Sequence, residues 1–102
     1  MGQHAISING GMGHISLPVR FDISSTAEFR MPFARFLTDA ATRKLVVDFS
    51  DLEYIDSLGI GMLLAWSKSC RENGKALVLD KCNAKTVRVF KLSGVDGLLE
   101  FS

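Results

Sequence analysis

The chain has 102 residues, of which 47% are hydrophobic and 23% charged, and twelve basic against eleven acidic residues give a net charge of +1. This composition predicts one globular domain with one core over residues 1–102. The balanced charge argues against direct nucleic-acid binding, and no apolar run is long enough for membrane insertion. The first ten residues lack a basic region followed by an apolar core, so we expect no secretory signal.

The N-terminal part of the chain predicts a β-hairpin. Residues 4–8 alternate in the manner of a strand, and Asn9-Gly10-Gly11 is a typical hairpin turn. We expect a second strand over residues 13–19, with Ile15, Leu17 and Val19 on one face. The turn matches neither GxGxxG nor the Walker pattern and precedes a strand, so it predicts no nucleotide cofactor.

A first helix is predicted after Asp22. Ser25 and Glu28 have the spacing of a capping box. The stripe that follows consists of Phe29, Phe33, Phe36 and Leu37, and this helical spacing is typical of a core face. Pro32 removes one helical hydrogen bond, so it should kink or shorten the helix.

Residues 44–66 organise the chain. Leu45, Val46, Val47 and Phe49 form an apolar run that is typical of a strand buried on both faces. After a polar break, Ser57 is well placed as the N-cap of a second helix, because its hydroxyl can accept a hydrogen bond from the first turn.

The second helix should run from Leu58 to about Glu72, with two distinct faces at 100° per residue. The face expected to lie against the sheet contains Gly59, Ile60, Leu63, Trp66, Ser67 and Cys70. The opposite face contains Leu58, Gly61, Met62, Ala65, Ser69 and Glu72. It is apolar only beside Ser57, which favours a binding surface. The alternative is that another helix covers it.

The remaining elements complete an α/β pattern. Gly74 should end the second helix, residues 76–79 predict a buried strand, and Asn83 should cap a third helix over residues 84–92. A short edge strand is expected near Leu98, Leu99 and Phe101. A hairpin followed by alternating helices and strands predicts a mixed sheet with right-handed parallel crossovers and helices mainly on one face.

Several kinds of chemistry are not expected. Cys70 and Cys82 form no CxxC pair and should be reduced thiols. His4 and His14 have no second ligand cluster, so we predict no metal site. Ser57 lacks the GxSxG elbow of hydrolases, so we do not expect an enzyme.

The segment VVDFSDLEYIDSLGIGMLL, residues 46–64, resembles the signature of the STAS domain, the fold of the bacterial anti-sigma-factor antagonists. In that family an apolar strand and an acidic loop precede Asp-Ser-(Ser/Thr)-Gly-Leu-Gly at the start of a helix. The resemblance implies that Ser57 is phosphorylated. Leu58 departs from the pattern, because it removes a second hydroxyl acceptor. The implied partner-binding residues are Asp22, Asp56, Leu58, Gly59, Ile60, Gly61 and Met62.

The resemblance implies two alternative functions in the cytoplasm, neither with a cofactor. In the first, the unphosphorylated domain binds an anti-sigma factor that is a serine kinase of the switch-protein type. Phosphorylation then releases it, and a PP2C-type phosphatase restores it. In the second, the domain is a STAS subunit of an ABC-type lipid transporter and binds the ATPase without a phosphorylation cycle.

Overall fold

Five strands form a mixed sheet in the structure, a computed structural model that describes residues 6–102 apart from the side chains of Ser25 and Thr26. The spatial order is β1-β2-β4-β6-β7. Strand β1 is antiparallel to β2, and every other neighbouring pair is parallel. The five strands are β1 (Ser7–Asn9), β2 (Met12–Ser16), β4 (Lys44–Asp48), β6 (Ala76–Asp80) and β7 (Glu100–Phe101).

The other elements connect these strands. A second, two-stranded sheet joins β3 (Arg20–Phe21) to β5 (Tyr54–Ile55) in parallel. The helices are α1 (Ile23–Thr26), η1 (Ala27–Phe29), α2 (Arg30–Thr38), α3 (Ser57–Glu72), α4 (Ala84–Leu92) and η2 (Asp96–Leu98). Among the described residues, none of these helices is both long enough and apolar enough to cross a membrane.

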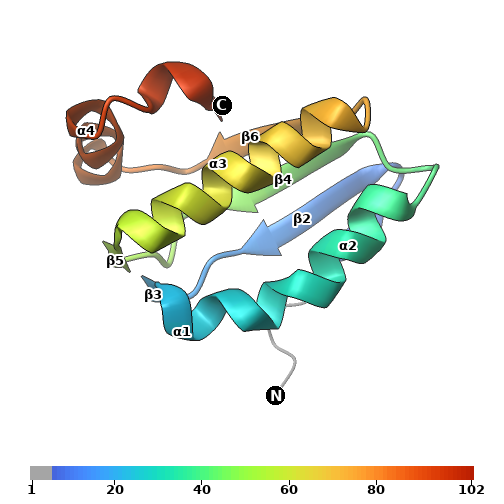
Figure 1. Ribbon diagram of the computed structural model, residues 1–102, viewed down its shortest axis with the longest axis horizontal. Helices are drawn as coiled ribbons and strands as arrows, with labels where there is room; N and C mark the ends of the chain where they lie inside the picture. Colours follow the sequence, from blue (N-terminus) through green and yellow to red (C-terminus); the bar gives the residue numbers. More distant parts are fainter. Residues whose placement is uncertain (1–5) are drawn as a thin grey trace.

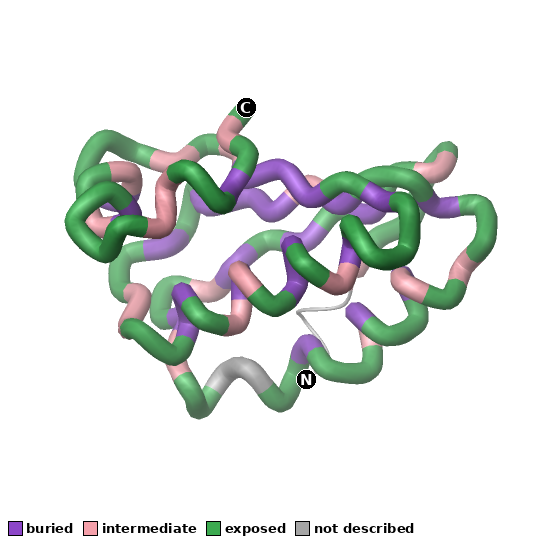
Figure 2. The backbone as a smooth tube through the Cα atoms, turned by 45° about the horizontal axis from the view of Figure 1, so that its top comes forward, coloured by how far each residue is buried: buried purple, intermediate pink, exposed green. Residues whose placement is uncertain are grey.

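Helices α2 and α3 cover one face of the sheet (Figure 1). The chain steps from β2 to β4 and then to β6 in one direction across the sheet, and right-handed crossovers in one direction place their helices on the same side. Buried positions accordingly gather along the inner strands and on the helix surfaces that face them (Figure 2). This arrangement confirms the predicted fold class.

One-sided coverage corrects the expectation for the central strand. Leu45 and Val47 are fully buried against the helices, whereas Val46 points to the other face and is only half-buried. The sequence pattern was therefore too apolar to distinguish a strand covered on one face from a strand covered on both.

The predicted hairpin is confirmed, although its first strand is Ser7–Asn9 and does not include Ile6; His4 lies outside the described residues. Asn9 pairs with Met12, and the two glycines between them have φ angles of 60° and 85°, as a type I′ turn requires. Strand β2 ends at Ser16, earlier than expected, and Val19 is 51% exposed. Pro18 explains this early end, because it has no N–H to extend the ladder.

The first predicted helix is divided into α1, the 3₁₀ turn η1 and α2. Pro32 is the third residue of α2, where the N–H would have no intrahelical acceptor in any residue. The break therefore precedes the proline, and α2 begins where Pro32 is tolerated. Phe29, Phe33 and Phe36 are buried as expected. The Ser25 side chain lies outside the described part, so the capping box stays a prediction.

The buried side chain of Lys75 forms hydrogen bonds at the end of the sheet where β4 and β6 begin. Lys75 is 9% exposed. Its ammonium group donates to the carbonyl oxygens of Asp39 at 2.7 Å and Thr42 at 2.9 Å, and to the Thr42 hydroxyl at 2.6 Å. Three hydrogen bonds compensate the buried charge and join the loop after α2 to the start of β6.

Trp66 is the centre of the core between the helices. Its ring centroid lies 5.1 Å from that of Phe33, 5.7 Å from Phe29 and 5.8 Å from Phe21. The side chain is 4% exposed. Trp66 therefore connects α3 with α2, with the 3₁₀ turn before α2 and with β3. This burial was expected from its place on the sheet-facing side of the helix.

We predict that Trp66→Ala lowers the free energy of unfolding by about 3–5 kcal/mol, the usual cost of truncating a large aromatic side chain in a core. Urea denaturation measures this change. Leu92→Ala is a suitable control, because Leu92 is 79% exposed on α4 and its truncation should change stability by less than about 0.5 kcal/mol. Unchanged stability of Trp66→Ala would contradict the core assignment.

Candidate functional site

The start of α3 is capped by Asp56. Its backbone is extended, its carboxylate accepts a hydrogen bond from the Gly59 N–H at 2.8 Å, and its carbonyl oxygen accepts from the Ile60 N–H at 3.0 Å. The expectation that Ser57 is the N-cap is therefore wrong by one residue. Aspartate caps a helix as well as serine does, and Asp56 additionally places a negative charge at the positive end of the helix dipole.

Ser57 is consequently the first helical residue, and it is exposed. Within the described part of the chain, no hydrogen bond engages its hydroxyl group, because Asp56 already performs the capping. The hydroxyl therefore lies at the positively polarised end of α3, where it is accessible to another protein.

A short strand that the sequence did not predict holds this helix start in place. Tyr54–Ile55, expected to be loop, pairs in parallel with Arg20–Phe21. Two residues are too few for a periodic signal, although tyrosine and isoleucine both favour strands. Because Phe21 is opposite Ile55, the register places Asp22 beside Asp56 at the ends of the two strands.

Gly59 and Ile60, two of the expected partner-binding residues, do not lie on the exposed surface. An ideal Cβ on Gly59 would lie 2.5 Å from the carbonyl oxygen of Phe21 and 2.8 Å from Cγ1 of Ile55. Ile60 is 7% exposed and belongs to the core. Gly59 lets the start of α3 approach β3 closely because it has no side chain. Ile60 is packed in the core below the helix start.

The other expected residues gather at the helix start. Leu58 is 54% exposed and Gly61 is exposed. Met62 is only half-buried rather than open, because it lines a small depression of about 140 Å³ together with Arg30, Phe33 and Trp66. We call the set that remains accessible the Ser57 surface, which comprises Asp22, Asp56, Ser57, Leu58, Gly61 and Met62.

Asp22 has a structural role, since it forms the turn into α1. Its Oδ1 accepts hydrogen bonds from the hydroxyl and the N–H of Ser24, and its Oδ2 lies 3.5 Å from Nε of Arg20. The Ser24 hydroxyl bond, together with the Ser24 N–H and Arg20, holds the pKa of Asp22 below its ordinary value despite desolvation. Asp22 is therefore ionised at neutral pH and adds negative charge beside Asp56.

Among the described residues, no group of three or more His, Cys, Asp or Glu side chains could hold a metal ion. Burial raises the pKa of both Cys70 and Cys82 to about 11, so both thiols are protonated and poorly nucleophilic at neutral pH.

The corrected cap leads to a matched pair of substitutions. We predict that Asp56→Ala lowers the free energy of unfolding by about 1 kcal/mol, the typical cost of losing an N-cap. Ser57→Ala should change stability by less than about 0.5 kcal/mol, because Ser57 is exposed and does not cap. Thermal unfolding of the two variants measures both effects, and a larger loss in Ser57→Ala would contradict the assignment of Asp56.

Sequence comparisons match most of this chain to one protein family. The family model described as Mlab, STAS domain matches residues 4–100. Anti-sigma-B factor antagonists of Listeria monocytogenes and Listeria innocua are each 30% identical over 56 residues, which is 55% of this chain. The match covers 49% of those relatives, so it spans about half of their length.

Solved structures show the same fold. The unphosphorylated anti-sigma factor antagonist SpoIIAA matches 97% of this chain and 87% of its own, with a TM-score of 0.78 and 17% identity. A putative anti-sigma factor antagonist from Thermotoga maritima matches 96% of this chain and 84% of its own, with a TM-score of 0.80 and 25% identity. The extent of the family match and the shared fold lead to one conclusion: the chain belongs to the STAS domain family.

Proposed function

We propose that this domain is a protein-binding module switched by phosphorylation, as in an anti-sigma-factor antagonist. Its unphosphorylated Ser57 surface binds an anti-sigma factor that is also a serine kinase, phosphorylation of Ser57 releases that partner, and a PP2C-type phosphatase reverses the change. The observation that carries the proposal is the exposed Ser57 hydroxyl at the start of α3, directly beside the exposed Leu58.

A phosphate on Ser57 is compatible with the fold. It would add about −1.5 to −2 charges at the end of α3 where the helix dipole favours negative charge by about 0.3–1 kcal/mol. Arg20 already engages Asp22 and the Tyr54 ring, whose centroid lies 4.2 Å from its guanidinium carbon. We infer that the phosphate acts on the partner rather than on the fold of the domain.

The charge around Ser57 explains why the modified domain should release its partner. No lysine or arginine occurs between residues 45 and 67, and Asp22 and Asp56 directly follow the paired strand residues Phe21 and Ile55. A phosphate would deepen this negative field and would have to be desolvated beneath a partner that covers Leu58. Relatives whose names describe them as anti-sigma-B factor antagonists support this reading.

Two observations favour a second candidate, a STAS subunit that binds the ATPase of an ABC-type lipid transporter without a phosphorylation cycle. Leu58 replaces the second hydroxyl residue of the antagonist signature, and the matching family description reads Mlab, STAS domain rather than antagonist. The genes adjacent to this one separate the candidates: a serine kinase and phosphatase favour the first, whereas a permease and an ATPase favour the second.

Leu58 provides the test of the contact surface. We predict that Leu58→Lys weakens binding to the cognate kinase at least tenfold, because a charge would enter an apolar contact, and leaves the melting temperature nearly unchanged. Isothermal titration calorimetry and thermal unfolding measure the two effects. Leu92→Lys is the matched control, because Leu92 is exposed on α4. Equal affinities of the two variants would place the partner elsewhere. Met62 serves less well, because it is half-buried.

Ser57 provides the test of the switch. We predict that mass spectrometry of the domain, after incubation with its cognate kinase and ATP, locates phosphate on Ser57 and that the modified form binds the kinase more weakly. Ser57→Ala should fold and bind but resist release. Ser57→Asp should reproduce release only in part, because it has one charge and lacks the three phosphate oxygens.

Two outcomes contradict different parts of the proposal. Phosphate on Ser50, Ser67 or Ser69 would refute the site, whereas phosphate on Ser57 with unchanged affinity for the kinase would refute the mechanism. The second outcome would favour the transporter-subunit candidate.

A further inference from the structure

Strand β5 has an unpaired edge that faces away from β3. On the paired edge, Tyr54 is opposite Arg20 and donates its N–H to the carbonyl oxygen of Val19 at 3.0 Å. Backbone groups of successive strand residues point to opposite edges, so the N–H and C=O of Ile55 point away from β3. Within the described residues, neither backbone group of Ile55 has a backbone hydrogen-bond partner outside this ladder.

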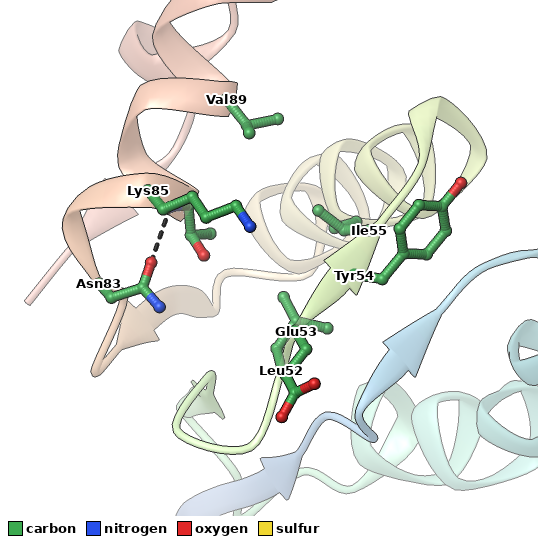
Figure 3. A pocket seen from close by; sticks show the side chains of 8 residues that line it. Leu52, Glu53, Tyr54, Ile55, Asn83, Lys85 and Val89 are labelled. Carbon is green, nitrogen blue, oxygen red and sulfur yellow. Dashed lines mark hydrogen bonds between the residues drawn. The ribbon is translucent and has the colours of Figure 1, made fainter.

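A cleft of about 470 Å³ lies between this edge and α4, within the volume range of natural binding sites. Its apolar lining comes from Leu52, Ile55 and Val89. Lys85, in the first turn of α4, extends its ammonium group into the cleft toward β5 (Figure 3). In the described part of the chain, the ion pairs found involve His14, Arg20 and Lys81 but not Lys85.

These features together fit one kind of occupant. An unpaired N–H and C=O on a strand edge are satisfied by another strand, as in β-augmentation. The apolar lining accepts alternate side chains of such a strand, and Lys85 offers a charge to a carboxylate opposite it. The Asn83 carboxamide is already engaged with the Thr86 N–H at 2.8 Å. Lys85 is therefore the charged donor that α4 contributes to the lining, whose other charged side chain is Glu53.

We propose that this cleft binds an extended segment of a partner protein, which adds to the free edge of β5 and places an acidic side chain against Lys85. This site is separate from the Ser57 hydroxyl, and it requires no phosphorylation. Because Ile55 directly precedes Asp56, a partner on the Ser57 surface could reach the cleft with a neighbouring segment.

The experiment uses the full ¹⁵N-labelled chain and the peptide acetyl-Thr-Val-Asp-Val-Thr-amide, followed by NMR. At saturation we expect the Ile55 amide to shift and its hydrogen exchange to slow at least tenfold, with shifts at Lys85. The same peptide with Lys in place of Asp should bind at least tenfold more weakly.

Charge reversal in the protein supplies the first control. Lys85→Glu should reverse the preference between the two peptides, and it should remain folded because an acidic residue is favourable in the first helical turn. Lys91→Glu, on an exposed position of the same helix, should leave the preference unchanged. Equal binding of the Asp and Lys peptides to the unmodified chain would overturn the proposal.

Backbone methylation supplies the second control. Two versions of the peptide carry N-methyl groups on alternate residues, and we call the two patterns phases: one methylates the odd-numbered residues and the other the even-numbered residues. Only one phase should abolish binding, because only alternate N–H groups of an added strand face β5. Identical behaviour of both phases, or an unchanged Ile55 amide, would overturn strand addition. If sodium acetate reproduced the Lys85 shifts and the peptide added none at Ile55, the site would be a small-anion site only. None of these measurements depends on a kinase, so their failure would leave the Ser57 switch untouched.

Discussion

The contact between Gly59 and the carbonyl oxygen of Phe21 determines the geometry of the end of this domain that carries the proposed site. Any side chain at position 59 would bring a carbon atom within 2.5 Å of that oxygen, so α3 reaches β3 only through glycine. That approach brings the ends of β3 and β5 against the start of the helix. Asp22 and Asp56 consequently lie at the ends of two paired strands, and Ser57 is the first residue of α3, which favours a precise geometry for the proposed surface.

One side of α3 packs in the core, and the opposite side of the same helix contributes residues to the Ser57 surface. Trp66 and Leu63 are buried on the first side, whereas Leu58 and Gly61 are exposed on the second. The separation follows from the 100° advance of successive residues. It means that substitutions on the exposed side do not enter the core, so Leu58→Lys can test the proposed binding surface separately from stability.

Long periodic elements could be predicted from the sequence, and short or contextual features could not. The sheet-facing side of α3 follows from helical spacing, the bounds of α4 were predicted with Asn83 as its cap, and the structure confirms both. Strand β5 was missed because two residues have no period. The cap was misplaced because Asp56 and Ser57 are equally good N-caps, and only the Gly59 N–H decides between them. The half-burial of Val46 depends on which side the crossovers take, which is a property of the whole sheet.

The lysine at the other end of the sheet has a consequence for how such a domain can diverge. Helix α3 has 16 residues and is therefore about 24 Å long, and Lys75 lies just beyond its last turn. There, bonds to Thr42 and Asp39 hold two connections together without any contribution from the Ser57 end. Duplicated copies of the gene could therefore acquire different partners at one end of the helix while they keep the Lys75 hydrogen bonds at the other.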